Sequence, residues 1–219
     1  MDSERQYIEL YEQARTMIHQ HSSEVMNSVR DAAFERFVAG GFPSRKVERY
    51  KYTDMAKLFE PDYGLNLNRY EIPVDPFKTF RCDVPNLSTL LYFVVNDAFY
   101  SNALPMAHLP EDVIIGSLRD HADKAAKYYA RLAKSVGDSV TALNTMLAQD
   151  GIFVYVPKGV KVDRAVQVIN ILKAPSPSGR SGGGSLMVNR RVLIVLEEGA
   201  EIKMLFCDHA ADDRNFLAT

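Results

Sequence analysis

The sequence predicts an α+β N-terminal region with a helical hairpin, followed by a mainly β region of short stacked strands. Three observations predict this class. Apolar residues recur at helical spacing over residues 3–40, a turn dipeptide separates two apolar runs at residues 96–97, and short alternating runs dominate after residue 150. With 219 residues the chain can bury a sizeable core, as one large domain or two small ones. We expect the two regions to span residues 1–137 and 138–219.

The helical hairpin is expected from two apolar stripes near the N-terminus. The first helix begins at Ser3, where Ser3 and Gln6 have the spacing of a capping box. The second begins at Ser22 or Ser23 and ends at the glycine pair 40–41, which suits a left-handed C-cap. The first stripe comprises Tyr7, Tyr11, Ala14 and Ile18. Such stripes usually face a core, so we expect both helices to pack on the rest of the chain.

The remainder of the N-terminal region alternates strand and helix patterns. Residues 90–95 and 98–101 are apolar runs separated by Asn96-Asp97, which predicts a hairpin with a tight turn. Residues 113–115 are expected to add a third strand. Helices are then expected over residues 118–136 and 139–148.

After Gly151 the pattern is that of strands. Alternating runs at 152–156, 160–162 and 166–172 are separated by Pro-Lys-Gly and Asp-Arg turns, and residues 191–206 repeat the behaviour. Periodicity alone fits either a sandwich or a β-helix. The corner at Glu198-Gly199, followed by a fresh alternating run, favours a β-helix, in which each coil needs tight corners.

Composition excludes several classes of partner and compartment. The formal net charge of −2 gives no electrostatic footprint for nucleic acid or for an anionic membrane. The N-terminal residues are polar and acidic, and no apolar run approaches the ~20 residues of a membrane span, so the cytoplasm is the expected compartment. Two cysteines, Cys82 and Cys207, do not make a disulfide scaffold.

The candidate chemical motifs are weak. The glycine-rich stretch 176–185 lacks the lysine and the following helix of a phosphate loop, so we interpret it as a loop between strands. Cys207 and His209 lie two residues apart, which on a strand supplies half a metal site, with no further ligand nearby in sequence. The adjacent carboxylates Glu197-Glu198 do not form an acid/base couple. We therefore assign no catalytic, cofactor-binding or metal-binding residue, and we expect no enzyme activity.

Three stretches carry a resemblance to a known family. They are "FPSRKVERYKYTDM" (residues 42–55), "ALNTMLAQDGIFVYVPKGVKVDRAVQVINIL" (142–172) and "RRVLIVLEEGAEIKML" (190–205). Together they resemble the SufB/SufD family of iron-sulfur cluster assembly proteins, and the short helical N-terminus with "ERYKYT" is most similar to SufD.

The resemblance implies a right-handed parallel β-helix after the α+β region, with the chain covering only its first coils. It also implies a cytoplasmic, non-catalytic scaffold subunit that pairs with a SufB-like paralogue and the ABC-type ATPase SufC to support iron entry and cluster assembly. The iron-sulfur cluster is then transient and belongs to the complex, with none expected in this chain alone.

Departures from the family pattern limit what is carried over. Tyr50 stands where the family more often has Trp, and Ala165 stands where Pro is common. Because the chain reaches only Thr219, it is expected to be a truncated β-helix, and we transfer no site residues. An open end predicts fraying after Leu186 or self-association, and a homodimer is one state allowed for the isolated chain.

Two other functions stay open at this point. One is a β-helical enzyme fragment acting on carbohydrate, which would need clustered outward carboxylates. The other is a cytoplasmic protein-interaction module that docks its partners through the N-terminal helical hairpin.

Overall fold

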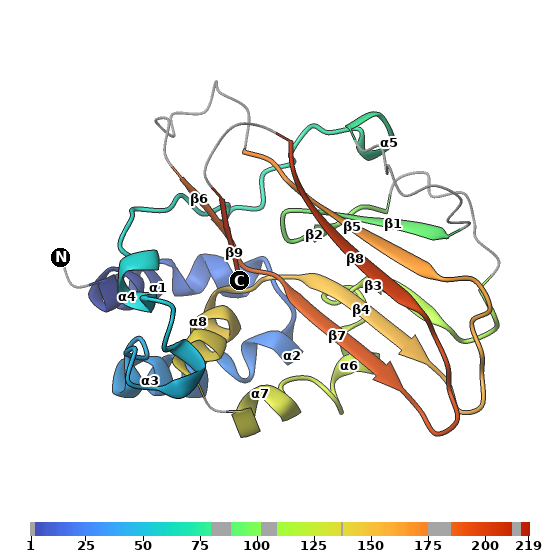
Figure 1. Cartoon of the computed structure of the whole chain (residues 1–219), viewed down its shortest axis with the longest axis horizontal. Coiled ribbons are helices and arrows are strands. Elements are labelled where there is room, and N and C mark those ends of the chain that lie inside the picture. The colour runs from blue at the N-terminus through green and yellow to red at the C-terminus, as the bar shows by residue number, and fades with distance from the viewer. Residues whose placement is uncertain (1–2, 80–88, 102–108, 137, 175–184, 212–215) are drawn as a thin grey trace.

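The computed structural model describes residues 3–79, 89–101, 109–136, 138–174, 185–211 and 216–219. Helical segments in this part of the chain are α1 (Ser3–Gln20), α2 (Glu24–Asn27), α3 (Arg30–Gly40), η1 (Glu48–Tyr50), α4 (Met55–Leu58), α5 (Pro76–Thr79), α6 (Ala122–Ala125), α7 (Arg131–Val136) and α8 (Ser139–Leu147). Strands are β1 (Leu90–Val95), β2 (Ala98–Phe99), β3 (Ile114–Ser117), β4 (Gly151–Val156), β5 (Val166–Leu172), β6 (Leu186–Val188), β7 (Arg191–Leu196), β8 (Met204–Ala210) and β9 (Phe216–Ala218). Helices α1, α3, α4 and α8 gather on one side, and most strands extend away from them (Figure 1).

The described strands form three small sheets. Their orders are β2-β1-β5-β8, β3-β4-β7 and β6-β9. The β1–β2 and β3–β4 pairs are antiparallel, whereas β1–β5, β5–β8, β4–β7 and β6–β9 are parallel. In the parallel pairs Gly151 lies opposite Arg191, and Val166 lies opposite Met204.

The predicted right-handed parallel β-helix is wrong, and so is the mainly β class. The described residues form a mixed α/β fold whose small mixed sheets close into neither a barrel nor a solenoid. Strands of the N-terminal region enter the same sheets as the later strands, because β1 pairs with β5 and β3 pairs with β4. Alternation and tight corners indicate which residues are buried and where the chain turns, but they do not specify how strands connect. The predicted boundary at residue 137 stays a prediction.

The helical hairpin packs on the rest of the chain, as its stripes predict. Tyr7, Tyr11 and Ile18 of α1 are at most 2% exposed and share a core with α3 and α8. Helix α8 is the centre of this core, since all its residues from Ala142 to Leu147 are buried. Asp138 caps α8 by accepting a hydrogen bond from the Thr141 amide at 2.7 Å.

The second helix of the hairpin differs from the expectation. Ser23 is its N-cap, as predicted, but the helix is interrupted between α2 and α3. The side chain of Arg30, the first residue of α3, is fully buried. Its guanidinium donates to the carbonyls of Thr145 (3.2 Å) and Met146 (2.9 Å) at the end of α8. Because the last carbonyls of a helix lack partners within it, Arg30 satisfies two groups that would otherwise be buried and unpaired.

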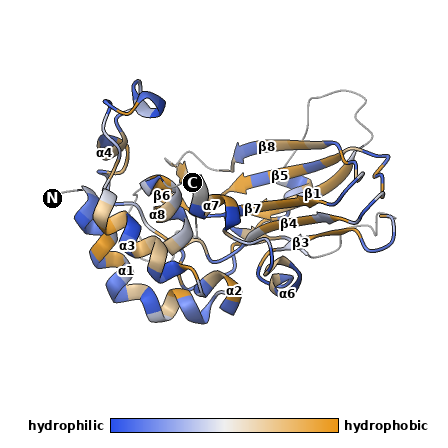
Figure 2. Ribbon diagram, turned by 90° about the horizontal axis from the view of Figure 1, so that it is seen from below, coloured by the Kyte–Doolittle hydropathy of each residue, from blue (hydrophilic) through white to orange (hydrophobic). Residues whose placement is uncertain are grey.

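Two apolar layers surround the sheet that contains β4. One face of β4 packs against β1 and β5, and Val154, Val156 and Val168 in this layer are completely buried. The other face packs against α2 and α6 through Phe153 and Tyr155. Seen from below, the helical group and the strands lie side by side as two parts of the molecule (Figure 2).

The other predicted elements are partly confirmed. The hairpin at residues 90–99 is present, with Asn96 in the left-handed region (φ 54°) as tight turns require. The helix expected over 118–136 is interrupted between α6 and α7, where Ala130 has φ 59°. A strand at 160–162 is wrong, because this segment contributes only an isolated bridge from Lys161 to Glu201.

Gly151 lies at the junction between α8 and β4, where the backbone of β7 approaches closely. A Cβ atom at this position would lie 1.8 Å from the carbonyl oxygen and 2.6 Å from the nitrogen of Arg191. Both are backbone atoms of the paired strand β7, so neither can move without breaking the register. A glycine is therefore required for β7 to approach β4 at this point.

We predict that Gly151→Ala destabilises the chain by about 3 kcal/mol or more, because the added methyl group collides with β7 backbone. Gly159→Ala is the matched control. Gly159 has φ 73°, but a Cβ there meets nothing within 4 Å, so only the conformational cost of about 1 kcal/mol applies. Urea unfolding of both variants measures the difference, and equal losses would show that the close approach at Gly151 is not needed.

Candidate functional site

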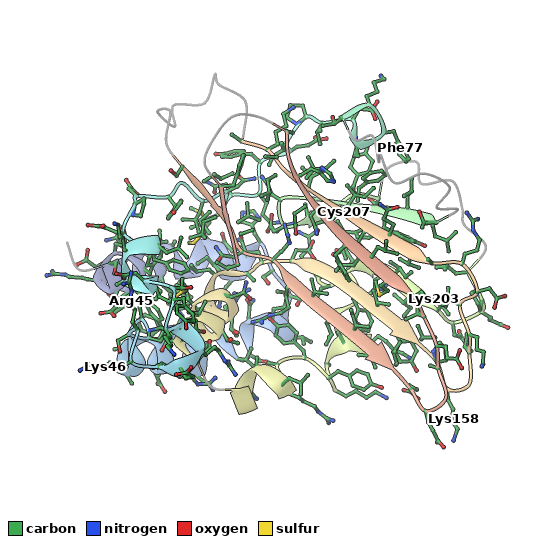
Figure 3. The ribbon with its side chains drawn as sticks, viewed as in Figure 1. Arg45, Lys46, Phe77, Lys158, Lys203 and Cys207 are labelled. Carbon is green, nitrogen blue, oxygen red and sulfur yellow. The ribbon has the colours of Figure 1, made fainter. Side chains whose placement is uncertain are left out.

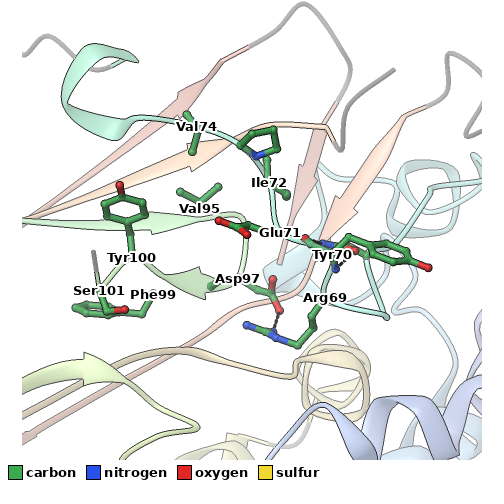
Figure 4. A pocket seen from close by; sticks show the side chains of 13 residues that line it. Arg69, Tyr70, Glu71, Ile72, Val74, Val95, Asp97, Phe99, Tyr100 and Ser101 are labelled. Carbon is green, nitrogen blue, oxygen red and sulfur yellow. Dashed lines mark hydrogen bonds and ion pairs between the residues drawn. The ribbon is translucent and has the colours of Figure 1, made fainter. Parts of the chain in front are cut away.

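The candidate site is a pocket of about 260 Å³ beside the β1–β2 hairpin. The segment 66–74 forms one wall and the hairpin forms the other (Figure 4). Its walls carry both charged and aromatic side chains, among them Arg69, Glu71, Asp97, Phe99 and Tyr100. A concave site with a few convergent polar groups on an apolar wall is the usual form of a small-molecule site.

A buried ion cluster connects this pocket to the rest of the fold. Arg69 pairs with Asp97 through one guanidinium nitrogen and with Asp150 through the other, at 3.2 Å. The side chains of Arg69, Asp97 and Asp150 are only 10%, 15% and 2% exposed. The Arg69 side chain extends from segment 66–74 toward Asp97 in the hairpin turn (Figure 4), and its backbone lies in the left-handed region with φ 51°.

Asp150 also joins the cluster to β3. Its Oδ1 atom accepts hydrogen bonds from the Ser117 hydroxyl at 2.9 Å and from the Arg119 amide at 3.0 Å. One carboxylate therefore ties β3, segment 66–74 and the start of β4 together. A buried carboxylate is tolerated only when its oxygens are paired in this way.

The cluster holds two carboxylates and a single guanidinium. Burial raises the pKa of Asp97 above its ordinary value, the Arg69 charge opposes that rise, and the neighbouring Asp150 charge adds to it. The described lining residues include no histidine, cysteine or lysine. We interpret the cluster as a structural clamp on the floor of the pocket.

The half metal site expected at Cys207 and His209 is not completed. Both residues lie on β8 and share one face, while Asp208 on the opposite face pairs with Arg190. Cys207 lies half-buried on β8 (Figure 3), and its Sγ atom accepts from the side-chain Nε2 of Gln167 at 3.5 Å. Among the residues that the structure describes, no three His, Cys, Asp or Glu side chains are grouped as metal ligands.

The remaining features predicted from the sequence have different outcomes. Residues 80–88, with Cys82, and residues 175–184, with nearly all of the glycine-rich stretch, lie outside the described residues. Of the adjacent carboxylates, Glu197 accepts from the hydroxyls of Tyr128 (2.8 Å) and Tyr155 (3.0 Å), and Glu198 pairs with Lys158. In the described part of the chain no helix is long and apolar enough to cross a membrane.

We predict that Arg69→Met destabilises the chain by about 3 kcal/mol at neutral pH, because it leaves two buried carboxylates without a counter-charge. Without Arg69 the pKa of Asp97 lies further above its unfolded value near 3.9. A carboxylate with a raised pKa is tolerated when protonated at low pH and becomes costly as the pH rises through that pKa, so the deficit should shrink as the pH is lowered from neutral.

Two controls accompany this measurement. Asp97→Asn added to Arg69→Met should recover part of the loss, since one unpaired charge is removed. Arg5→Met removes an exposed ion pair with Glu9 and should cost less than about 1 kcal/mol. A loss of stability in Arg69→Met that does not change with pH would contradict the interpretation of the cluster as a structural clamp.

Comparison with known proteins identifies the family. The family model described as "SufBD protein N-terminal region" matches residues 1–168. Protein ABCI7, chloroplastic, of Arabidopsis thaliana is 25% identical over 210 residues, covering 90% of this chain and 41% of that protein. The iron-sulfur cluster assembly SufBD family protein slr0074 of Synechocystis sp. is 32% identical over 89 residues, which is 41% of this chain and 17% of that protein. The chain thus spans less than half the length of these relatives, and it belongs to the SufBD family.

Proposed function

We propose that the chain is a scaffold subunit of an iron-sulfur cluster assembly complex, where it pairs with a SufB-like paralogue and a SufC-like ABC ATPase. The family match over residues 1–168 carries this proposal. The Synechocystis relative, whose name includes iron-sulfur cluster assembly, supports it. The "ERYKYT" motif at residues 48–53 and the short helical N-terminus favour the SufD branch of the family.

In this proposal the chain performs no chemical step of its own. ATP hydrolysis belongs to the ATPase subunit, and the nascent cluster is cargo held at the level of the complex. In the pocket beside β1–β2, the side chains of Arg69 and Asp97 are paired with one another in the clamp. We place the complex in the cytoplasm, and subcellular fractionation tests that compartment.

The alternative, in which the N-terminal hairpin docks partners, is weakened by where its apolar stripe lies. Tyr7, Tyr11 and Ile18 of α1 and Phe37 of α3 are buried against α8 and the segment after α3. The stripe is thus used inside the chain. The outer face of the hairpin is mostly polar, with Val38, at 49% exposed, as its main apolar residue.

We predict that the tagged reading frame, purified without oxygen from its native cells, brings along an ABC-type ATPase and a longer SufBD paralogue, with bound iron and sulfide. Mass spectrometry identifies the partners, and colorimetric assays measure the metal and sulfide. A protein recovered alone and free of metal would contradict the proposal.

A matched variant separates the two functions. Glu12→Lys combined with Val38→Lys changes exposed positions on α1 and α3 without entering the core. The scaffold proposal predicts that this variant retains both partners. Loss of both partners, with an unchanged unfolding curve, would favour docking through the hairpin.

A further inference from the structure

The pocket beside the β1–β2 hairpin holds more negative than positive charge. Among the described residues that line it, Arg69 is the only cation, and its guanidinium already pairs with Asp97 and Asp150. One guanidinium between two carboxylates leaves one negative charge uncompensated. Lys173 donates to the Pro73 carbonyl at 2.9 Å but does not line the pocket. The charge at the described wall therefore favours a cation over an anion.

Glu71 adds a further carboxylate to this wall. It makes no hydrogen bond or ion pair with any residue that the structure describes, in contrast to Asp97, whose Oδ2 atom binds Arg69. Figure 4 shows the Glu71 side chain pointing from segment 66–74 toward the hairpin. Because Glu71 is exposed and also lines the pocket, a ligand that enters from solvent can reach its carboxylate.

The rest of the wall is apolar and aromatic. Ile72 and Val74 come from segment 66–74, Val95 comes from the end of β1, and Tyr100 follows β2 (Figure 4). Tyr100 is half-buried and packs near Val74. Aromatic rings attract cations to their faces, and a planar guanidinium both stacks on rings and binds carboxylates with two hydrogen bonds. Such a wall suits an organic cation that carries an apolar chain.

The same wall is poorly suited to a bare metal ion. Magnesium and calcium take six or more oxygen ligands, most of them supplied by carboxylates, carbonyls and water. Within the described ranges, no three His, Cys, Asp or Glu side chains are grouped closely enough to hold a metal. The Arg69 guanidinium beside Asp97 would also repel a divalent ion.

We propose that this pocket binds a small organic cation, with a guanidinium or ammonium head group at Glu71 and a short apolar chain against Ile72, Val74 and Val95. The volume of about 260 Å³ limits its size, because it holds about nine non-hydrogen atoms at about 30 Å³ each. The Arg69 clamp forms the floor and keeps its own pairing. This inference is independent of the proposed function, since it concerns binding to the chain itself.

An NMR titration of the ¹⁵N-labelled chain tests the proposal with two probes of equal size. Pentylguanidinium carries the charge, and pentylurea is its neutral isostere. At low ionic strength we expect pentylguanidinium to bind with a dissociation constant of about 1 mM or lower. The shifted amides should lie in residues 66–74 and 95–101. Pentylurea should bind at least about tenfold more weakly, because it cannot pair with a carboxylate.

Three variants locate the head group. Glu71→Gln should weaken pentylguanidinium at least about threefold, and it should fold because the residue is exposed. Tyr100→Leu should weaken it about two- to fivefold through loss of the ring. Glu12→Gln is the matched control, since it removes an exposed carboxylate on α1 and should leave binding unchanged. The amide spectrum of each variant shows whether it is folded.

Several results would overturn the proposal. One is the absence of saturable shifts in these residues up to about 20 mM pentylguanidinium, a concentration well above the expected dissociation constant. Equal binding of pentylurea would show that the pocket recognises only the apolar chain. Equal weakening by Glu71→Gln and Glu12→Gln would show a general effect of net charge. Displacement of pentylguanidinium by millimolar magnesium, with shifts at the same amides, would assign the site to an inorganic cation.

Discussion

The structure depends on the close contact between two strands where α8 ends and β4 begins. Gly151 allows the backbone of Arg191 to approach where any side chain would collide, and this fixes the register of β7 on β4. One residue earlier, the Asp150 carboxylate holds β3 and segment 66–74 through Ser117, Arg119 and Arg69. Two adjacent residues therefore join the helical core to both sides of the sheet.

The same register determines what the chain leaves exposed. Since β7 follows β4 residue by residue, its apolar side chains fall on the face of the buried core layer, and its free backbone groups fall on the outer edge. Strand β8 repeats this relation with β5.

Local signals in the sequence predicted local structure. The apolar stripe of α1, the cap at Ser23 and the turn at Asn96 were predictable because each depends on residues a few positions apart. The burial of Arg30 was not, since that side chain binds carbonyls more than a hundred positions away. The alternating runs identified β4 and β5 as buried strands, yet they contained no information on connectivity, and the β-helix prediction failed for that reason.

The candidate site was missed for the same physical reason. Arg69 is 28 positions from Asp97 and 81 positions from Asp150. The three residues match no motif, so only the folded chain brings them together. Asp97 was visible in the sequence only as part of a turn. Asp150 was visible only as the residue before a glycine. By contrast, the family was recognisable because its motifs are continuous stretches, of which 42–55 and most of 142–172 lie within the residues that the family model matches.

Residue-resolved hydrogen exchange by NMR tests the account most directly, because the register assigns each β7 amide to one side of the strand. At low protein concentration we predict slow exchange at Leu193 and Val195, which face β4, and fast exchange at Val192, Ile194 and Leu196. Equal protection of all five amides at low concentration would contradict the account.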